Sequence, residues 1–115
     1  MWEVEYTDRF EQWWSKLGVD KQSRISAAID LLIVDGPNLG RPYVDTIARS
    51  RHSNMKELRV STLRILFAFD PLRKAILLLG GDKSGQWSRW YPRAISRADD
   101  LYDQHLASLR DEGLI

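Results

Sequence analysis

The first residues of the chain alternate between apolar and acidic side chains. Trp2, Val4 and Tyr6 are separated by Glu3 and Glu5. A period of two residues is typical of a strand with one buried face. The sequence therefore predicts a short N-terminal strand.

Two amphipathic helices are predicted to follow this strand. The first begins at Thr7 or Asp8, either of which can cap it, and ends at Gly18; the second covers residues 20–35, before a Gly-Pro pair. Apolar side chains recur on one face of each, at Phe10, Trp13, Trp14 and Leu17 in the first and at Ile25, Ala28, Ile29, Leu32 and Ile33 in the second. Because few residues separate them, we expect an antiparallel helical hairpin.

The middle of the chain changes from irregular to strand-like. Residues 36–53 show no steady period and contain two prolines, as functional or mobile segments often do. Three strand-like runs follow, MKELRV, LRILFAF and KAILLLG, with Ser61-Thr62 between the first two and Asp70-Pro71 before the third. With the N-terminal strand they predict a small, mostly antiparallel sheet carrying the helical hairpin on one face. A C-terminal helix over residues 86–109 completes an α+β fold.

Length and composition narrow the class of protein. The 115 residues fit a single domain, residues 1–115, and 43% of them are hydrophobic, enough for one core. There is no cysteine, which excludes disulfides and thiolate metal sites. No signal-like or membrane-length apolar run is present, so we expect a cytoplasmic protein.

Charge is distributed unevenly along the chain although the net charge is only +1. Residues 1–40 carry four Lys or Arg against seven Asp or Glu, whereas residues 41–74 carry eight against three. Such an asymmetry favours an anionic partner. A solvated surface with scattered arginines explains the charges equally well.

The first predicted hairpin places two arginines opposite each other. If Ser61-Thr62 is a two-residue loop, Arg59 faces Arg64, with Glu57 on the same side of the sheet and the apolar residues on the other. Like charges across a sheet are destabilising, which favours an anion such as phosphate bound between the guanidinium groups on an open face. The alternative is that Glu57 neutralises both arginines in a surface ion network.

Further candidates flank this hairpin. Gly80-Gly81 is predicted to turn the chain and present Lys83 beside the arginines, and Arg51 and His52 enter the hairpin from the irregular segment. A later group mixes cations with aromatic rings that can stack on bases or anchor the last helix: Trp87, Arg89, Trp90, Tyr91 and Arg93. No metal-ligand spacing is present, so neither a metal nor a cofactor is expected.

Taken together, these residues resemble the RelE/ParE toxin superfamily, and more closely its HigB-like, phage Gp49-like branch. The resemblance rests on MKELRVSTLRILFAFD followed by AILLLGGDKSG, and it covers most of the chain. It implies a toxin of a type II toxin–antitoxin system that cleaves mRNA on the ribosome without a metal, inhibited by a cognate HigA-like helix-turn-helix antitoxin. Arg64, Arg59 and Lys83 match basic positions of the family. Several relatives have lysines where this chain has Met55 and Glu57, and a histidine-tyrosine pair after the last strand is absent, with Tyr91 a distant substitute.

These inferences assign roles to the site residues. Arg64 and Arg59 are expected to clamp the phosphate, Lys83 to support its charge or protonate the leaving oxygen, and Glu57, or failing it His52, to accept the 2′-proton. Contacts to the flanking RNA are expected from a wider set, Lys56, Arg51, His52, Arg89 and Tyr91. The nuclease hypothesis depends on an open gap between the two arginines; if ion pairs beneath a packed helix close that gap, only kinship of fold is left. The alternatives are a ParE-like toxin that inhibits gyrase by binding and a non-catalytic relative that binds RNA or an antitoxin.

Overall fold

The computed structural model describes residues 1–85 and 87–115, with the backbone alone for Trp87. Its elements follow the order β1 (Glu3–Tyr6), α1 (Asp8–Ser15), α2 (Val19–Asp35), a 3₁₀ turn (Gly36–Asn38), β2 (Val44–Thr46), β3 (Lys56–Val60), β4 (Leu63–Phe69), β5 (Lys74–Asp82) and α3 (Trp87–Asp111). The strands form one sheet in the order β1-β5-β4-β3-β2. Only the β1–β5 pair is parallel among these described strands. The predicted α+β class is confirmed.

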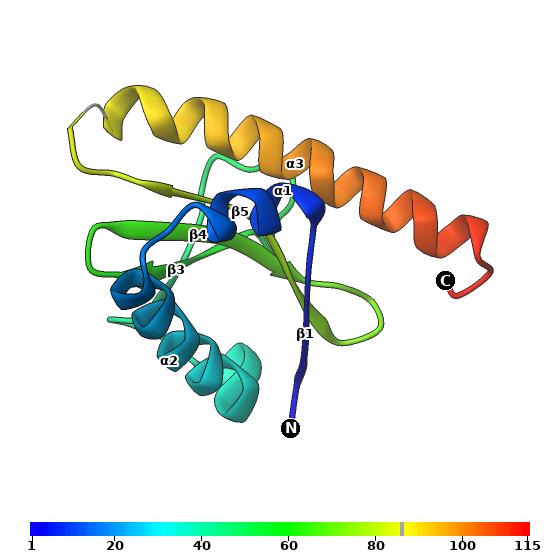
Figure 1. Cartoon of the computed structure of the whole chain (residues 1–115). Coiled ribbons are helices and arrows are strands. Elements are labelled where there is room, and N and C mark those ends of the chain that lie inside the picture. Colours follow the sequence, from blue (N-terminus) through cyan, green and yellow to red (C-terminus); the bar gives the residue numbers. More distant parts are fainter. Residues whose placement is uncertain (86) are drawn as a thin grey trace.

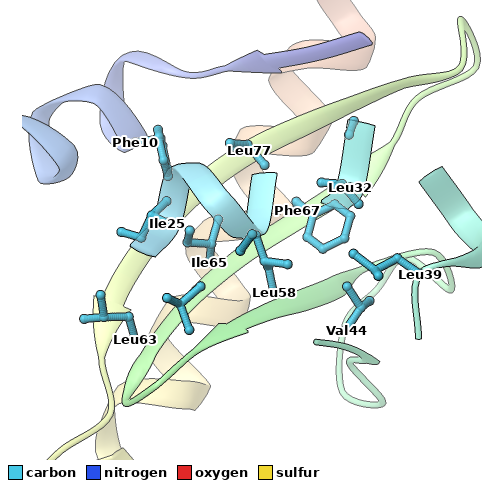
Figure 2. Packing of buried hydrophobic residues seen from close by; sticks show 13 residues of the cluster. Phe10, Ile25, Leu32, Leu39, Val44, Leu58, Leu63, Ile65, Phe67 and Leu77 are labelled. Carbon is cyan, nitrogen blue, oxygen red and sulfur yellow. The ribbon is translucent and has the colours of Figure 1, made fainter. Parts of the chain in front are cut away.

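Both faces of the sheet are covered by helices (Figure 1). One face carries α1 and α2, and its core gathers side chains of Phe10, Ile25 and Leu32 over Leu58, Ile65, Phe67 and Leu77, as Figure 2 shows. Burying this apolar surface is the main driving force for seating the two helices. The other face carries α3, which packs Ala94, Ile95, Ala98 and Tyr102 against Met55, Leu66, Ala68, Ile76 and Leu78.

The β3–β4 hairpin has the register that its sequence predicts. Val60 pairs with Leu63, Arg59 with Arg64 and Leu58 with Ile65. Ser61 adopts a left-handed conformation, φ 56°, in the two-residue connection. Because side chains alternate along a strand, Glu57, Arg59 and Arg64 share the α3 side.

Three details differ from the sequence prediction. The irregular segment contains a fifth strand, β2, whose three residues are too short to show a period. Met55 and Glu57, expected on an exposed face, are buried because α3 lies on that face. Gly80 and Gly81 lie within β5 instead of forming a turn.

The two strand glycines make room for tryptophan rings. A Cβ on Gly80 would lie 2.4 Å from the ring of Trp13, and one on Gly81 would lie 2.3 Å from Trp90 Nε1. Glycine in a strand often marks such a close approach. These two residues therefore let α1 and α3 sit close to opposite faces of β5.

The start of α1 and the end of α2 follow the predicted signals, whereas α1 ends at Ser15, before the predicted stop at Gly18. Thr7 caps α1, its hydroxyl accepting a hydrogen bond from the Phe10 amide at 3.1 Å. Gly36 ends α2 with φ 55°, a conformation that favours glycine. Across the described residues, none of the helices combines the length and apolar character needed to cross a membrane.

Candidate functional site

Glu57 is the centre of a polar cluster between β3 and α3. Its carboxylate is only 6% exposed and accepts a short hydrogen bond from the Tyr91 hydroxyl. The Nε of Arg64 lies 3.3 Å from Glu57 Oε1, and an Nη of Arg59 lies 3.7 Å from Oε2. A buried carboxylate is stable only when paired in this way.

The two arginines do not leave an open gap between them. Arg64 is 7% exposed and directs one Nη to the carbonyl oxygens of Ser61 and Leu63, at 2.7 and 2.8 Å. Its Nε faces Glu57. The predicted anion gap on an open face is therefore wrong, because α3 covers that face and Glu57 takes up both charges. The alternative, in which Glu57 neutralises the arginines, matches the structure, although the network is buried and does not lie on the surface.

Arg59 extends the charge network toward β2. Its Nη2 donates to Asp45 at 3.1 Å, and Asp45 also accepts from Arg41 at 3.0 Å. The hydrogen bond from Arg41, more than any other cause, lowers the pKa of Asp45. Three guanidinium groups thus share two carboxylates, so this cluster stays positive. Among the described residues, the Nε–H of Arg59 is the one buried side-chain polar group without a hydrogen-bond partner.

Tyr91 is held protonated, as a hydrogen-bond donor to Glu57. Burial, and after it the hydrogen bond to the Glu57 carboxylate, raises the pKa of the Tyr91 phenol well above its ordinary value. The phenol therefore stays protonated at neutral pH. The sequence analysis expected Tyr91 to contact RNA and did not foresee its pairing with Glu57, since the two residues are 34 positions apart.

An open hollow of about 430 Å³ gives access to this cluster. Glu57 and Tyr91 lie on its wall together with Arg49, and the rest of its lining comes from the β2 region and the first turns of α3: Thr46, Ile47, Ala48, Ser88, Pro92 and Ile95. A carboxylate, a phenol and a guanidinium group therefore face one solvent-accessible space. We call it the Glu57 hollow. Asp45 and Arg49 were missed by the sequence analysis because they lie in the segment without periodicity.

Lys83 and Lys56 take different positions around the site. Lys83 follows β5, and its amide donates to the Thr62 carbonyl oxygen at 2.9 Å, which places it beside the hairpin turn as predicted. Lys56 pairs with Phe67 in the β3–β4 ladder and so shares its face, the one that carries α2. The structure therefore places Lys56 on the opposite face of the sheet from Glu57.

Arg51 and His52 contact α3 at a point far from Tyr91. Arg51 contacts Asp99, Asp100 and Asp103, with its shortest distance, 2.6 Å, to Asp103. His52 Nε2 lies 2.7 Å from the same carboxylate. Twelve residues separate Tyr91 from Asp103, about 18 Å along a helix. The structure does not bring these two predicted residues to Glu57. Arg89 is on the other flank of α3, outside the Glu57 hollow.

The architecture defines a protein with the RelE-like fold. A chain of the RelB-RelE antitoxin-toxin complex from Methanococcus jannaschii aligns with a TM-score of 0.60 at 13% identity, covering 75% of this chain and 98% of that one. A chain of the E. coli DinJ-YafQ toxin-antitoxin complex aligns with a TM-score of 0.57 at 12% identity, covering 75% and 97%. At these identities the likeness concerns the fold.

Sequence comparison narrows the class to a family. Residues 12–103 match the family described as phage derived protein Gp49-like. A Mycobacterium tuberculosis protein named as toxin HigB3 is 53% identical over 100 residues, 85% of this chain and 88% of that protein. Another from that organism, named as toxin HigB2, is 46% identical over 109 residues, 90% of this chain but 54% of that protein, so the chain spans about half its length. The chain belongs to the Gp49-like, HigB-type family of toxins of type II toxin–antitoxin systems, as its sequence motifs predict, and it has a RelE-like fold.

Proposed function

We propose that the chain is a ribosome-dependent endoribonuclease that cuts mRNA without a metal ion and thereby inhibits translation. One observation carries the chemistry: Glu57 accepts a hydrogen bond from Tyr91 on the wall of an open hollow, with Arg59 and Arg64 beside it. Family membership supports the same proposal. The closed gap rules out the phosphate clamp on which the sequence-based hypothesis depended. The proposal therefore rests on the Glu57–Tyr91 pair and on family membership instead.

Each side chain has a chemical task in this proposal. The 2′-oxygen of the RNA attacks the adjacent phosphorus, its proton passes to Glu57, and the bond from phosphorus to the 5′-oxygen breaks. Tyr91, or Lys83 at the hairpin end, donates the proton that the 5′-oxygen needs. A carboxylate and a phenol pair cover both proton transfers, so the step balances without a metal.

The two arginines divide the remaining work. Arg59 has a half-buried guanidinium group and is less enclosed than Arg64, so it is the phosphate ligand. Arg64 is occupied by two carbonyl oxygens and Glu57, and so acts by positioning the carboxylate. Arg49 on the wall of the hollow adds positive charge toward the flanking strand.

We further propose that a cognate helix-turn-helix antitoxin inhibits the chain. The structures that share its fold include the RelB-RelE and DinJ-YafQ toxin-antitoxin complexes. Co-expression with the gene that lies beside it in the genome tests this: the neighbouring product should co-purify with the chain and restore growth. A neighbour that neither binds nor rescues contradicts the assignment.

Mapping of mRNA 5′ ends in a cell-free translation reaction tests the nuclease. We expect cuts with the wild type in the presence of ribosomes, and a loss of about 10²–10⁴-fold in rate for Glu57→Gln and for Tyr91→Phe. Tyr43→Phe is the matched control, since Tyr43 is 45% exposed and lies outside the hollow. Glu57→Gln that cuts like the wild type contradicts the site. Intact mRNA together with blocked DNA supercoiling by gyrase would establish the ParE-like alternative instead.

A further inference from the structure

A second hollow lies on the opposite flank of α3 from Glu57. It has a volume of about 510 Å³ and is bounded by α1, β5 and the first half of α3. Four arginines line it, Arg9 from α1 and Arg89, Arg93 and Arg97 from α3. No acidic side chain is among its described lining residues. We call it the arginine hollow.

Three of the four arginines of this hollow keep their charge available. Arg9, Arg93 and Arg97 make no ion pair or side-chain hydrogen bond in the part of the chain that the structure describes. Like charges four residues apart on a helix are destabilising, and Arg89, Arg93 and Arg97 repeat that spacing. A concentration of unpaired guanidinium groups in a concave site raises the local concentration of anions.

The arrangement of the arginines suits a linear anion. Residues spaced by four stand about 6 Å apart along a helix axis, so Arg89, Arg93 and Arg97 form a ladder of positive charge along α3. Arg9 faces the same space from α1. A chain of phosphates running along the hollow can meet several guanidinium forks in succession.

The floor of the hollow favours a nucleic-acid backbone over an acidic protein segment. Leu79 and Ala94 are covered, at 5% and 6% exposed, so the hollow offers no deep aliphatic pocket for the anchoring side chains on which protein interfaces depend. Phosphate contacts need charge alone. Trp90, half-buried in the lining, adds a ring on which a base can stack.

We propose that the arginine hollow binds the phosphodiester backbone of single-stranded RNA and holds the substrate strand outside the reacting site. The inference rests on the proposed nuclease function. Trp90 lines the arginine hollow and Tyr91 the Glu57 hollow, and their rings touch edge to face with centroids 4.9 Å apart. One RNA strand can therefore cross over the Trp90 and Tyr91 rings and occupy both hollows.

The test measures binding without cleavage. The probe is a short, fluorescently labelled 2′-O-methyl RNA strand, which has no free 2′-hydroxyl and cannot be cut. We expect Arg93→Gln/Arg97→Gln to bind it roughly tenfold more weakly than the wild type by fluorescence anisotropy. The slope of log K against log salt should fall in magnitude by about 1.4, as two lost contacts to a single strand predict. Arg110→Gln, an exposed arginine at the far end of the same helix, is the matched control and should bind like the wild type.

The outcomes separate this inference from the nuclease proposal. If the double variant binds like the wild type, or Arg110→Gln loses as much affinity, the arginine hollow is not the site, whatever the cleavage assay shows. If a polyglutamate peptide binds in place of the RNA strand, the hollow serves an acidic protein and the inference is wrong. If the double variant alone loses binding while the wild type never cuts mRNA, the arginine hollow is an RNA-binding site and the nuclease proposal fails. Circular dichroism checks that the double variant and Arg110→Gln keep the fold intact.

Discussion

The two hollows that flank the first half of α3 hold their arginines in opposite ways. Behind the wall of the Glu57 hollow, Arg64 and Arg59 are paired with Glu57 and Asp45. In the arginine hollow, Arg9, Arg93 and Arg97 have no such partner among the described residues. Paired arginines fix the geometry of a carboxylate, whereas unpaired ones keep their charge available to a ligand. The difference shows that the same residue type positions a reacting group on one side of the helix and attracts an anion on the other.

Removing the arginine that pairs with Glu57 and one arginine of the arginine hollow should give the sharpest contrast. Arg64→Ala leaves Glu57 buried without its closest guanidinium partner and deprives two carbonyl oxygens of a donor. We expect the free energy of unfolding to fall by about 3–5 kcal/mol in urea denaturation. Arg97→Ala, the matched change in the arginine hollow, should stay within about 0.5 kcal/mol of the wild type.

A double substitution keeps this prediction testable if Arg64→Ala does not fold. Glu57→Leu combined with Arg64→Leu removes the pair together, so neither charge is left buried, and most of the stability should return while mRNA cleavage stays lost. Equal losses of stability for Arg64→Ala and Arg97→Ala contradict the contrast between the hollows.

The Trp90 and Tyr91 rings, which separate the two hollows, offer the next test. Gly81→Ala places a methyl group where the Trp90 ring lies, 2.3 Å from Nε1, so Trp90 has to move. Overpacking of this kind costs about 1–3 kcal/mol of unfolding free energy. Gly40→Ala is the control, because nothing lies within 4 Å of its added Cβ. A Gly81→Ala variant as stable as Gly40→Ala would show that Trp90 is not packed against β5 in solution.

Sequence reasoning was able to predict the part of the site that depends on local pairing. A two-residue connection fixes the register of β3 and β4, and alternation then puts Glu57, Arg59 and Arg64 on one side of the sheet. It did not reveal that α3 covers this side, because three polar residues on a strand face look solvent-exposed. The Glu57–Tyr91 pair joins β3 to α3, and that docking depends on apolar contacts such as those of Met55 and Ala98.

The other omissions have local causes. Asp45 belongs to a strand of three residues, too short for a period, so its pairing with Arg59 was not visible. The arginine hollow joins α1 to α3, which are separated by most of the chain, and Arg9 carries no sequence signal of its own. Gly80-Gly81 was interpreted as a turn, since a glycine pair that accommodates tryptophan rings has the same sequence signature.

Both hollows require that α3 stays packed on the sheet. Asp103 is one of the residues that hold α3 there, through Arg51 and His52. Arg51, and after it His52, lowers the pKa of Asp103 through hydrogen bonds. A carboxyl whose pKa is lower in the folded state stabilises that state at a pH above its unfolded value of about 3.9, and this contribution is lost as the pH falls through the folded pKa. Asp103→Asn should therefore unfold at a slightly lower temperature than the wild type above about pH 5.

The pH dependence of this small difference distinguishes a tether from a packing defect. As the pH falls below the unfolded pKa of Asp103 and then through its folded pKa, the wild type loses the charge that the variant never had, so the two melting temperatures should converge. Asp111→Asn, an exposed change at the end of the same helix, controls for the loss of one negative charge and should melt like the wild type throughout. A gap between Asp103→Asn and the wild type that persists unchanged into strong acid shows that Asp103 holds α3 through contacts other than its charge. The seating of α3 would then depend on its apolar packing and on hydrogen bonds such as that from Tyr91 to Glu57.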